Sequence, residues 1–431
     1  MPKIKEIKTR EILDSNGNPT LETKVILDDG SFGLASVPSG TSKGKNEAVE
    51  LRDGNPKQYK GKGVLKASEA VNKIIGKKLV GLELKNQKTI DLVLIKLDGT
   101  KNKSNLGANS LLSVSLAVAK AMANSLNLPL YQYIRQMSNV KCPRQRRVRL
   151  WRKMSKENLP IPMFNIINGG KHADNNLDLQ EFMVVPHLDS FSKNLQAGSE
   201  IYHTLGDILE KNGLSFSYGL EGGFAPTLET NTQGLDLLLE ASEEASYRPS
   251  KEIFLALDIA ASSLWKKEDK TYLLNLEKVS LPALQLTSLY NEWTLHYPLI
   301  SIEDGLFEDD FEGWKKLTEK LGNKVLVVGD DLFCTNPERL KKGIKEKLAN
   351  AVIIKPNQIG TLTETLGVVK LAKDNGYKIV VSHRSGETND AFIADLAVGI
   401  GADFIKAGPP VRGERLAKYN RLLEIEEEIN K

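Results

Sequence analysis

The sequence predicts an α/β protein with a C-terminal β/α barrel, preceded by an N-terminal α+β domain of a small antiparallel meander sheet and helices. Two observations support this. The first third holds alternating, β-branched runs followed by an Ala- and Leu-rich stretch. Beyond Pro160, short apolar runs alternate with amphipathic stretches. We therefore expect the N-terminal domain at 1–136, a basic insertion or linker at 137–157, and the barrel at 158–431 with the catalytic site.

The N-terminal sheet is predicted from three runs, at 3–9, 20–27 and 31–37, whose apolar and polar residues alternate. The dipeptide Asp29-Gly30 between the last two is typical of a hairpin turn. The stretch 106–136 has helical apolar periodicity, which Pro129 interrupts. We expect these helices to cover the sheet.

The barrel is predicted from six short apolar runs that each end in an ionisable residue. The runs are FLALD, LISIE, VLVVGD, AVIIK, KIVVSH and DFIK, and they end at Asp258, Glu303, Asp330, Lys355, His383 and Lys406. The last four separations, 23 to 28 residues, match one strand plus one helix, which parallel strands require. The carboxyl ends of such strands meet at one mouth of a barrel, where barrel enzymes place their chemistry.

The residue types at these strand ends indicate metal-assisted acid–base chemistry. Converging carboxylates at Asp258, Glu303 and Asp330 would repel one another, and hard oxygen ligands suit Mg²⁺. Positive charge beside Lys355 and Lys406 would lower a lysine pKa, so one of them could act as a base near neutral pH. A base beside a metal is typical of carbanion chemistry.

Further polar residues complete the candidate site. The guanidinium of Arg384 and the hydroxyl of Ser385 suit a phosphate or a carboxylate. Glu181 and Glu221 flank strand or glycine-rich segments, where a partly desolvated carboxyl can keep its proton and act as an acid. Taken singly, each residue also fits a plainer role, because strand-end acids are more often helix caps or surface charges.

Composition excludes several classes of protein. The chain has 431 residues, a net charge of +4 and 26% charged residues, which is ordinary for a large globular protein, and its apolar runs are too short to span a bilayer. We expect a cytoplasmic protein. The segment 141–153 holds seven basic and no acidic residues, which leaves −3 on the rest of the chain. It is either a nucleic-acid or anionic-membrane binding segment or, as we favour, a solvated interdomain insertion.

Matching stretches run through nearly the whole chain outside 137–157, among them REILDSNGNPT, VPSGTSKG, NIINGGKHADNN, QEFMVVP, EGGFAP, SIEDGL, IKPNQIGTLTET, SHRSGETND and ERLAKYNRLLEIEEE. On these stretches the sequence resembles the enolase family. The resemblance implies an enolase-type, TIM-like barrel and reversible dehydration of 2-phospho-D-glycerate to phosphoenolpyruvate, a step of glycolysis and gluconeogenesis. It also implies two Mg²⁺ per active site and a homodimer or larger homo-oligomer.

The resemblance also implies residue roles. Lys355 matches the base that removes the C2 proton, Glu221 the acid that protonates the departing C3 hydroxyl, and Lys406 a group that stabilises the enolate. The groups that support these steps are matched by His172 and Glu181. The substrate contacts are matched by Gln180, His383, Arg384 and Ser385, together with Lys406. The ligands of the first Mg²⁺ are matched by Asp258, Glu303 and Asp330, and a ligand of the second by Ser42.

Departures from the family pattern lie around the site. Lys43 and Lys45 follow Ser42 where the family has a neutral and usually an acidic residue, and Leu220 replaces the aspartate before the acid. Glu424 stands where the family has an arginine that pairs with Glu22 across the dimer, so we expect a weakened dimer, with Arg10 opposite the acidic tail as compensation.

Two rival functions stay open. A catalytically impaired enolase homologue acting as a binding protein should have lost the metal ligands or the base, and all of them are present. Another superfamily enzyme is disfavoured by the retained Arg384-Ser385 pair. The final Lys431 resembles the lysine by which some surface-exposed family members bind host plasminogen, which by analogy would add a cell-surface location.

Overall fold

The computed structural model of the chain describes residues 1–40, 44–138, 159–215 and 217–431. The predicted metal ligand Ser42, its neighbour Lys43 and the basic segment 141–153 lie outside these residues.

The N-terminal part contains a three-stranded antiparallel sheet, as predicted. Its strands are β1 (Ile4–Leu13), β2 (Pro19–Leu27) and β3 (Phe32–Ser36), and they pair in the order β1-β2-β3. The turn between β2 and β3 contains Gly30, whose positive φ of 90° suits a glycine. Gly33 of β3 lies against a helix so closely that a Cβ atom there would meet the carbonyl oxygen of Ala117 at 2.1 Å.

Helices cover this sheet. They are η1 (Tyr59–Gly61), α1 (Leu65–Glu69), η2 (Ala70–Ile75), α2 (Gly76–Leu79), α3 (Gln87–Asp98), α4 (Ala108–Ser125) and α5 (Leu130–Ser138). Helix α5 begins directly after Pro129, where the sequence predicted a break. Taken one at a time, the helices of the described residues are too short or too polar to cross a membrane, although α4 and α5 together pass that test as a bent pair.

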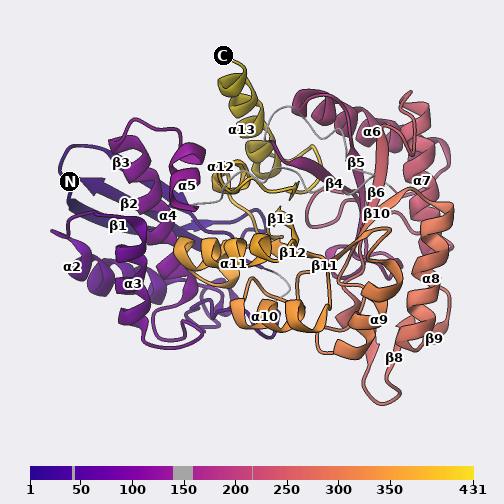
Figure 1. Cartoon of the computed structure of the whole chain (residues 1–431), viewed down its shortest axis with the longest axis horizontal. Helices are drawn as coiled ribbons and strands as arrows, with labels where there is room; N and C mark the ends of the chain where they lie inside the picture. The colour runs from indigo at the N-terminus through magenta and orange to yellow at the C-terminus, as the bar shows by residue number, and fades with distance from the viewer. Residues whose placement is uncertain (41–43, 139–158, 216) are drawn as a thin grey trace.

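The C-terminal part is a closed eight-stranded barrel, and the six predicted runs form six of its strands (Figure 1). Around the barrel, the strands are β4 (Ile161–Asn168), β5 (Glu181–Pro186), β6 (Ile253–Asp258), β10 (Leu299–Glu303), β11 (Leu326–Gly329), β12 (Ala351–Ile354), β13 (Lys378–Ser382) and β14 (Phe404–Lys406). The prediction of a barrel is confirmed.

One strand corrects the expectation of a parallel barrel, because β5 runs antiparallel to both β4 and β6. Residues 169–180, which join β4 to β5, contain only the short helix η4 (Gly170–His172) and no crossover α-helix. As a consequence β5 starts at the mouth where the parallel strands end, and its first residue, Glu181, pairs in register with Asp258.

Helices surround the barrel, and a small antiparallel sheet interrupts the pattern. The helices are α6 (Phe191–Lys211), α7 (Asn231–Glu244), η5 (Ala261–Ser263), α8 (Ala283–His296), α9 (Phe311–Leu321), α10 (Pro337–Glu346), η6 (Pro356–Gln358), α11 (Leu362–Asp374), α12 (Phe392–Ile400) and α13 (Gly413–Asn430). The sheet comprises β7 (Trp265–Lys266), β8 (Thr271–Leu274) and β9 (Val279–Leu281), and it accounts for the longer separation between Asp258 and Glu303.

The two parts of the chain pack side by side, with α11 and α12 of the barrel against α3, α4 and α5 (Figure 1). Ser39 and Gly386 exchange backbone hydrogen bonds of 2.8 and 2.9 Å across this boundary. Lys120 also pairs with Asp390 at 2.7 Å. These contacts hold the N-terminal part beside the loop that follows β13.

Candidate active site

A cavity that is open to solvent lies at the mouth of the barrel. Most predicted site residues line it: His172, Gln180, Glu181, Glu221, Asp258, Asp330, Lys355, His383, Arg384, Ser385 and Lys406. Glu303 lies beneath them and is 1% exposed. The fold therefore brings together all the predicted site residues that lie within the described part of the chain.

Lys406, at the end of β14, is the central cation of the cavity. Its Nζ lies 2.8 Å from Glu303, 3.1 Å from Glu181 and 3.2 Å from Asp258. Burial alone would lower the pKa of Lys406, but the surrounding carboxylates raise it well above its usual value. Lys406 is therefore a fixed ammonium group.

The carboxylates around Lys406 fit a divalent cation. Glu303 and Asp258 lie in register on adjacent parallel strands. Burial and neighbouring negative charges raise the pKa of Asp258 and raise that of Glu303 further, despite Lys406. Such a raised pKa marks uncompensated negative charge, and carboxylate oxygens are the ligands that Mg²⁺ prefers. On this ground the residues present fit the expected metal.

Lys355 pairs with Asp330 in this cavity, with its Nζ in direct contact with the carboxylate. The sequence predicted a lowered pKa for a lysine here, and the structure shows the opposite direction for Lys355. Burial and the charges of Arg384 and Lys406 lower its pKa, but the charge of Asp330 outweighs them. A direct carboxylate partner therefore holds the lysine in its charged form.

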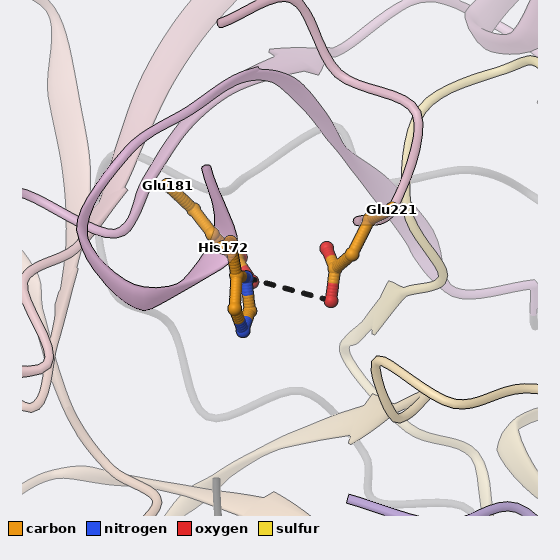
Figure 2. A group of neighbouring side chains, drawn as sticks. All are labelled: His172, Glu181 and Glu221. Atoms are coloured by element: carbon orange, nitrogen blue, oxygen red, sulfur yellow. Dashed lines mark ion pairs between the residues drawn. The ribbon is translucent and has the colours of Figure 1, made fainter. Parts of the chain in front are cut away.

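Figure 2 shows a second group, in which His172 lies beside Glu181 and Glu221. The Nδ1 atom of His172 lies 3.4 Å from Glu181 Oε1 and 3.6 Å from Glu221 Oε1. Burial lowers the pKa of His172, but the two carboxylates raise it to a net value above the usual one. The charged form of His172 is thus stabilised by two acidic neighbours.

The pKa of Glu221 corrects the expectation that burial lets this carboxyl keep its proton. Burial does raise it, but His383, His172 and a buried arginine bring the net pKa well below the usual value. The Glu221 Oε2 atom also accepts a hydrogen bond of 2.8 Å from the Asn165 amide, a contact that the sequence reasoning missed. Glu221 is therefore ionised in this structure.

Arg384, the predicted anion-binding residue, is held by a carboxylate of the N-terminal part. Its guanidinium lies 2.9 Å from Glu47 and donates a bond of 3.2 Å to Asn357. The sequence reasoning did not single out Glu47, although it lies in the same segment as the predicted metal ligand Ser42. The anion-binding side of the cavity is thus assembled from both parts of the chain.

Among the described residues, the carboxylates of Asp304, Asp330 and Asp331 also approach one another closely enough to share an ion. Asp304 already accepts backbone N–H bonds of 2.9 Å from Asp330 and 2.8 Å from Asp331. Its carboxyl therefore shapes the loop after β11. Only Asp330 of this trio belongs to the predicted ligand set.

Two residues that depart from the family pattern, Leu220 and Lys45, lie in the described part of the chain. The side chain of Leu220 is exposed, while its backbone N–H donates a bond of 2.8 Å to the carbonyl of His172. This backbone contact does not involve the side chain at position 220. The exposed Lys45 lies 3.6 Å from Asp309, so an acidic neighbour partly offsets its charge.

Both acidic residues invoked for a weakened dimer have partners within the chain. Arg10 lies 2.6 Å from Glu22 on the adjacent strand, and Glu424 lies 2.9 Å from Arg421 one turn earlier on α13. Within the chain, Arg10 lies opposite Glu22 in the β1–β2 register, and the expectation that it faces the acidic tail across a dimer stays a prediction.

The fold and the site define a two-domain β/α-barrel protein whose acidic and basic side chains converge at the mouth of the barrel. Two family descriptions match the chain: the enolase N-terminal domain over residues 4–134 and the enolase C-terminal TIM barrel domain over residues 156–431. The chain belongs to the enolase family. This membership supports a lyase activity of the enolase superfamily.

Proposed function

We propose that the protein catalyses the reversible dehydration of 2-phospho-D-glycerate to phosphoenolpyruvate. The observation that carries the proposal is that the base and the acid that this reaction requires, Lys355 and Glu221, line the same cavity as the buried ammonium of Lys406. Family membership supports the same reaction class.

In the proposed reaction Lys355 accepts the proton from C2, and the ammonium of Lys406 stabilises the negative charge that then develops on the carboxylate of the substrate. Two Mg²⁺ ions, held by Asp258, Glu303 and Asp330 with Ser42 as a further ligand, would add positive charge at that carboxylate and draw the charge of Asp330 away from Lys355. Lys355 acts as a base only in its neutral form.

Loss of the C3 hydroxyl requires a proton, which Glu221 delivers in this proposal. Since Glu221 is ionised in the structure, it must first receive that proton. His172, whose pKa is raised and whose Nδ1 lies 3.6 Å from Glu221, is the nearby source. Glu181, on the other side of His172, keeps the imidazole charged.

The substrate phosphate is placed at Arg384 and Ser385, with His383 and Gln180 as neighbouring contacts. A guanidinium binds a phosphate with two parallel hydrogen bonds, which fixes orientation as well as affinity. The proposal retains the role in glycolysis and gluconeogenesis and the homodimer or larger homo-oligomer that the family resemblance implies. It also retains the cytoplasmic location expected from the sequence and the division at 1–136, 137–157 and 158–431.

The test is the rise in ultraviolet absorbance of the enol product when the purified protein, Mg²⁺ and 2-phosphoglycerate are mixed. We expect a rise that EDTA abolishes and that Lys355→Ala lacks. A matched control is Lys267→Ala, which removes an exposed lysine on the turn between β7 and β8. An absence of any EDTA-sensitive rise would favour an enolase homologue that acts as a binding protein.

A further inference from the structure

Arg415, on the first turn of α13, is buried directly behind the candidate site. Its side chain is 0% exposed. Its guanidinium lies 2.7 Å from Nδ1 of His383, and it donates bonds of 2.7 Å to the carbonyl of Arg384 and 2.8 Å to that of Ser385. One side chain therefore contacts all three residues of the predicted anion-binding loop.

The contact with His383 determines which ring nitrogen carries the proton. An arginine side chain only donates hydrogen bonds and does not lose its proton in proteins, so Nδ1 of His383 must accept. A neutral imidazole that accepts at Nδ1 carries its proton on Nε2. The Nε2 atom lies 3.5 Å from Glu221 Oε2, so the N–H side of the ring is nearest the candidate acid.

The surroundings of His383 support this arrangement. Burial and the charge of Arg415 lower the pKa of His383, while Glu221 and Glu181 raise it less, so the ring is neutral. Gly408, with φ of 87°, leaves room for the pair, because a Cβ atom there would lie 2.8 Å from Arg415 and 3.2 Å from His383. The fold thus keeps space for this one contact.

We propose that Arg415 is a positioning residue, which fixes His383 as the Nε2–H tautomer and holds residues 383–385 so that their side chains face the cavity. The kinetic consequence rests on the proposed function, whereas the tautomer assignment does not. Loss of Arg415 leaves Nδ1 of His383 without a donor and removes a charge that lowers the pKa of the ring, so Nδ1 can take up a proton while the Nε2–H stays against Glu221.

Lys418 provides a matched control on the same helix. Its Nζ is buried, lies 2.7 Å from Glu387 and donates a bond of 2.8 Å to the carbonyl of Glu414. Lys418 therefore anchors the same loop a few residues later, through Glu387 rather than His383. A change that merely loosens the loop should have similar effects in Arg415→Met and Lys418→Met, but only the former removes the donor to Nδ1.

The experiment is ¹⁵N NMR of histidine-labelled protein, which contains five histidines, with the His383 signals assigned by their loss in His383→Gln. We expect a proton on Nε2 alone in the wild type and in Lys418→Met, and a proton on Nδ1 as well in Arg415→Met. Arg415→Lys should retain Nε2–H, because a lysine also only donates. A proton on Nδ1 in the wild type, or an Nδ1 signal that is unchanged in Arg415→Met, would overturn the proposal.

Kinetics with 2-phosphoglycerate give the second measurement. We expect kcat to fall about 100-fold in Arg415→Met, as for a small misplacement of reacting groups, and to recover at least tenfold in Arg415→Lys. Equal losses in Arg415→Met and Lys418→Met would contradict a specific role. If Arg415→Met does not fold, the wild-type spectrum still decides the tautomer. A wild type with Nε2–H but no turnover would overturn the proposed function and leave the tautomer assignment standing.

Discussion

The carboxylate of Glu47 and the guanidinium of Arg384, whose side chains are 9% and 5% exposed, form an ion pair of 2.9 Å between the N-terminal part and the barrel. Glu47 also accepts a bond of 3.0 Å from the backbone N–H of Gly44. The residue proposed to bind the substrate phosphate therefore already holds an anionic group of the protein. A substrate must either share the guanidinium with Glu47 or displace it.

We expect Glu47→Gln to bind inorganic phosphate about three- to tenfold more tightly than the wild type, because a charged competitor for Arg384 is removed. Isothermal titration calorimetry measures this affinity. Glu50→Gln is the matched control, since Glu50 lies three residues away and pairs with Arg52. Similar gains in both variants would show that only the net charge matters. Glu47→Gln should also lower stability, because it leaves Arg384 without its buried ionic partner.

Lys355→Ala and Glu221→Gln should stop different steps of the proposed reaction. The lysine variant should lose exchange of the C2 proton, which NMR detects in deuterated water. The glutamate variant should lose elimination while retaining some exchange, because proton removal does not require Glu221. Equal loss of exchange in both variants would contradict this division of roles.

His172 should titrate above its ordinary pKa of about 6.5 in the metal-free protein, because Glu181 and Glu221 stabilise its charged form. A raised folded-state pKa contributes stability that is fully present below about pH 6.5 and is lost as the pH rises through the folded value. The imidazole NMR signals report this titration. Glu221→Gln should lower the pKa of His172, whereas Glu200→Gln, at the surface beside Tyr247, should leave it unchanged.

The expectation of a weakened dimer can be tested by measuring how tightly two copies of the chain associate. Glu424→Arg should tighten a dimer at low salt if residue 424 faces Glu22 of a second copy, by about fivefold at most for an exposed pair. Since Arg10 already pairs with Glu22, the gain should be larger in an Arg10→Ala background. Analytical ultracentrifugation measures the dissociation constant. An unchanged value in both backgrounds would remove the reason to expect a weakened dimer.

The sequence predicted the barrel because strand ends are visible as apolar runs that stop at an ionisable residue, and the four runs after Glu303 follow at nearly regular intervals. It could not predict the direction of β5. Strand direction depends on how the connection closes, and residues 169–180 carry no local signal that distinguishes a hairpin from a crossover. Glu181 was nevertheless placed in the site from its sequence match.

The charge states could not be predicted from position alone. The pKa values of Lys355 and Glu221 depend on partners within a few ångströms, Asp330 and His383, which lie far away in sequence. Glu47 was missed for the same reason, since 337 residues separate it from Arg384. Arg415 lies in ERLAKYN, a stretch that carried the family resemblance but suggested no role by itself.

Anchors from distant parts of the chain hold the loop after β13. The hydroxyl of Ser15 accepts a hydrogen bond of 3.0 Å from the backbone N–H of Glu387, and the backbone N–H of Ser15 donates one of 2.7 Å to the carbonyl of Glu387. Lys418 lies 2.7 Å from the side-chain carboxylate of Glu387. Contacts that join residues 372 positions apart form late, because closing such a long segment costs chain entropy first. During refolding, barrel secondary structure should therefore return before the anion-binding loop is ordered, and recovery of activity should lag behind recovery of circular dichroism.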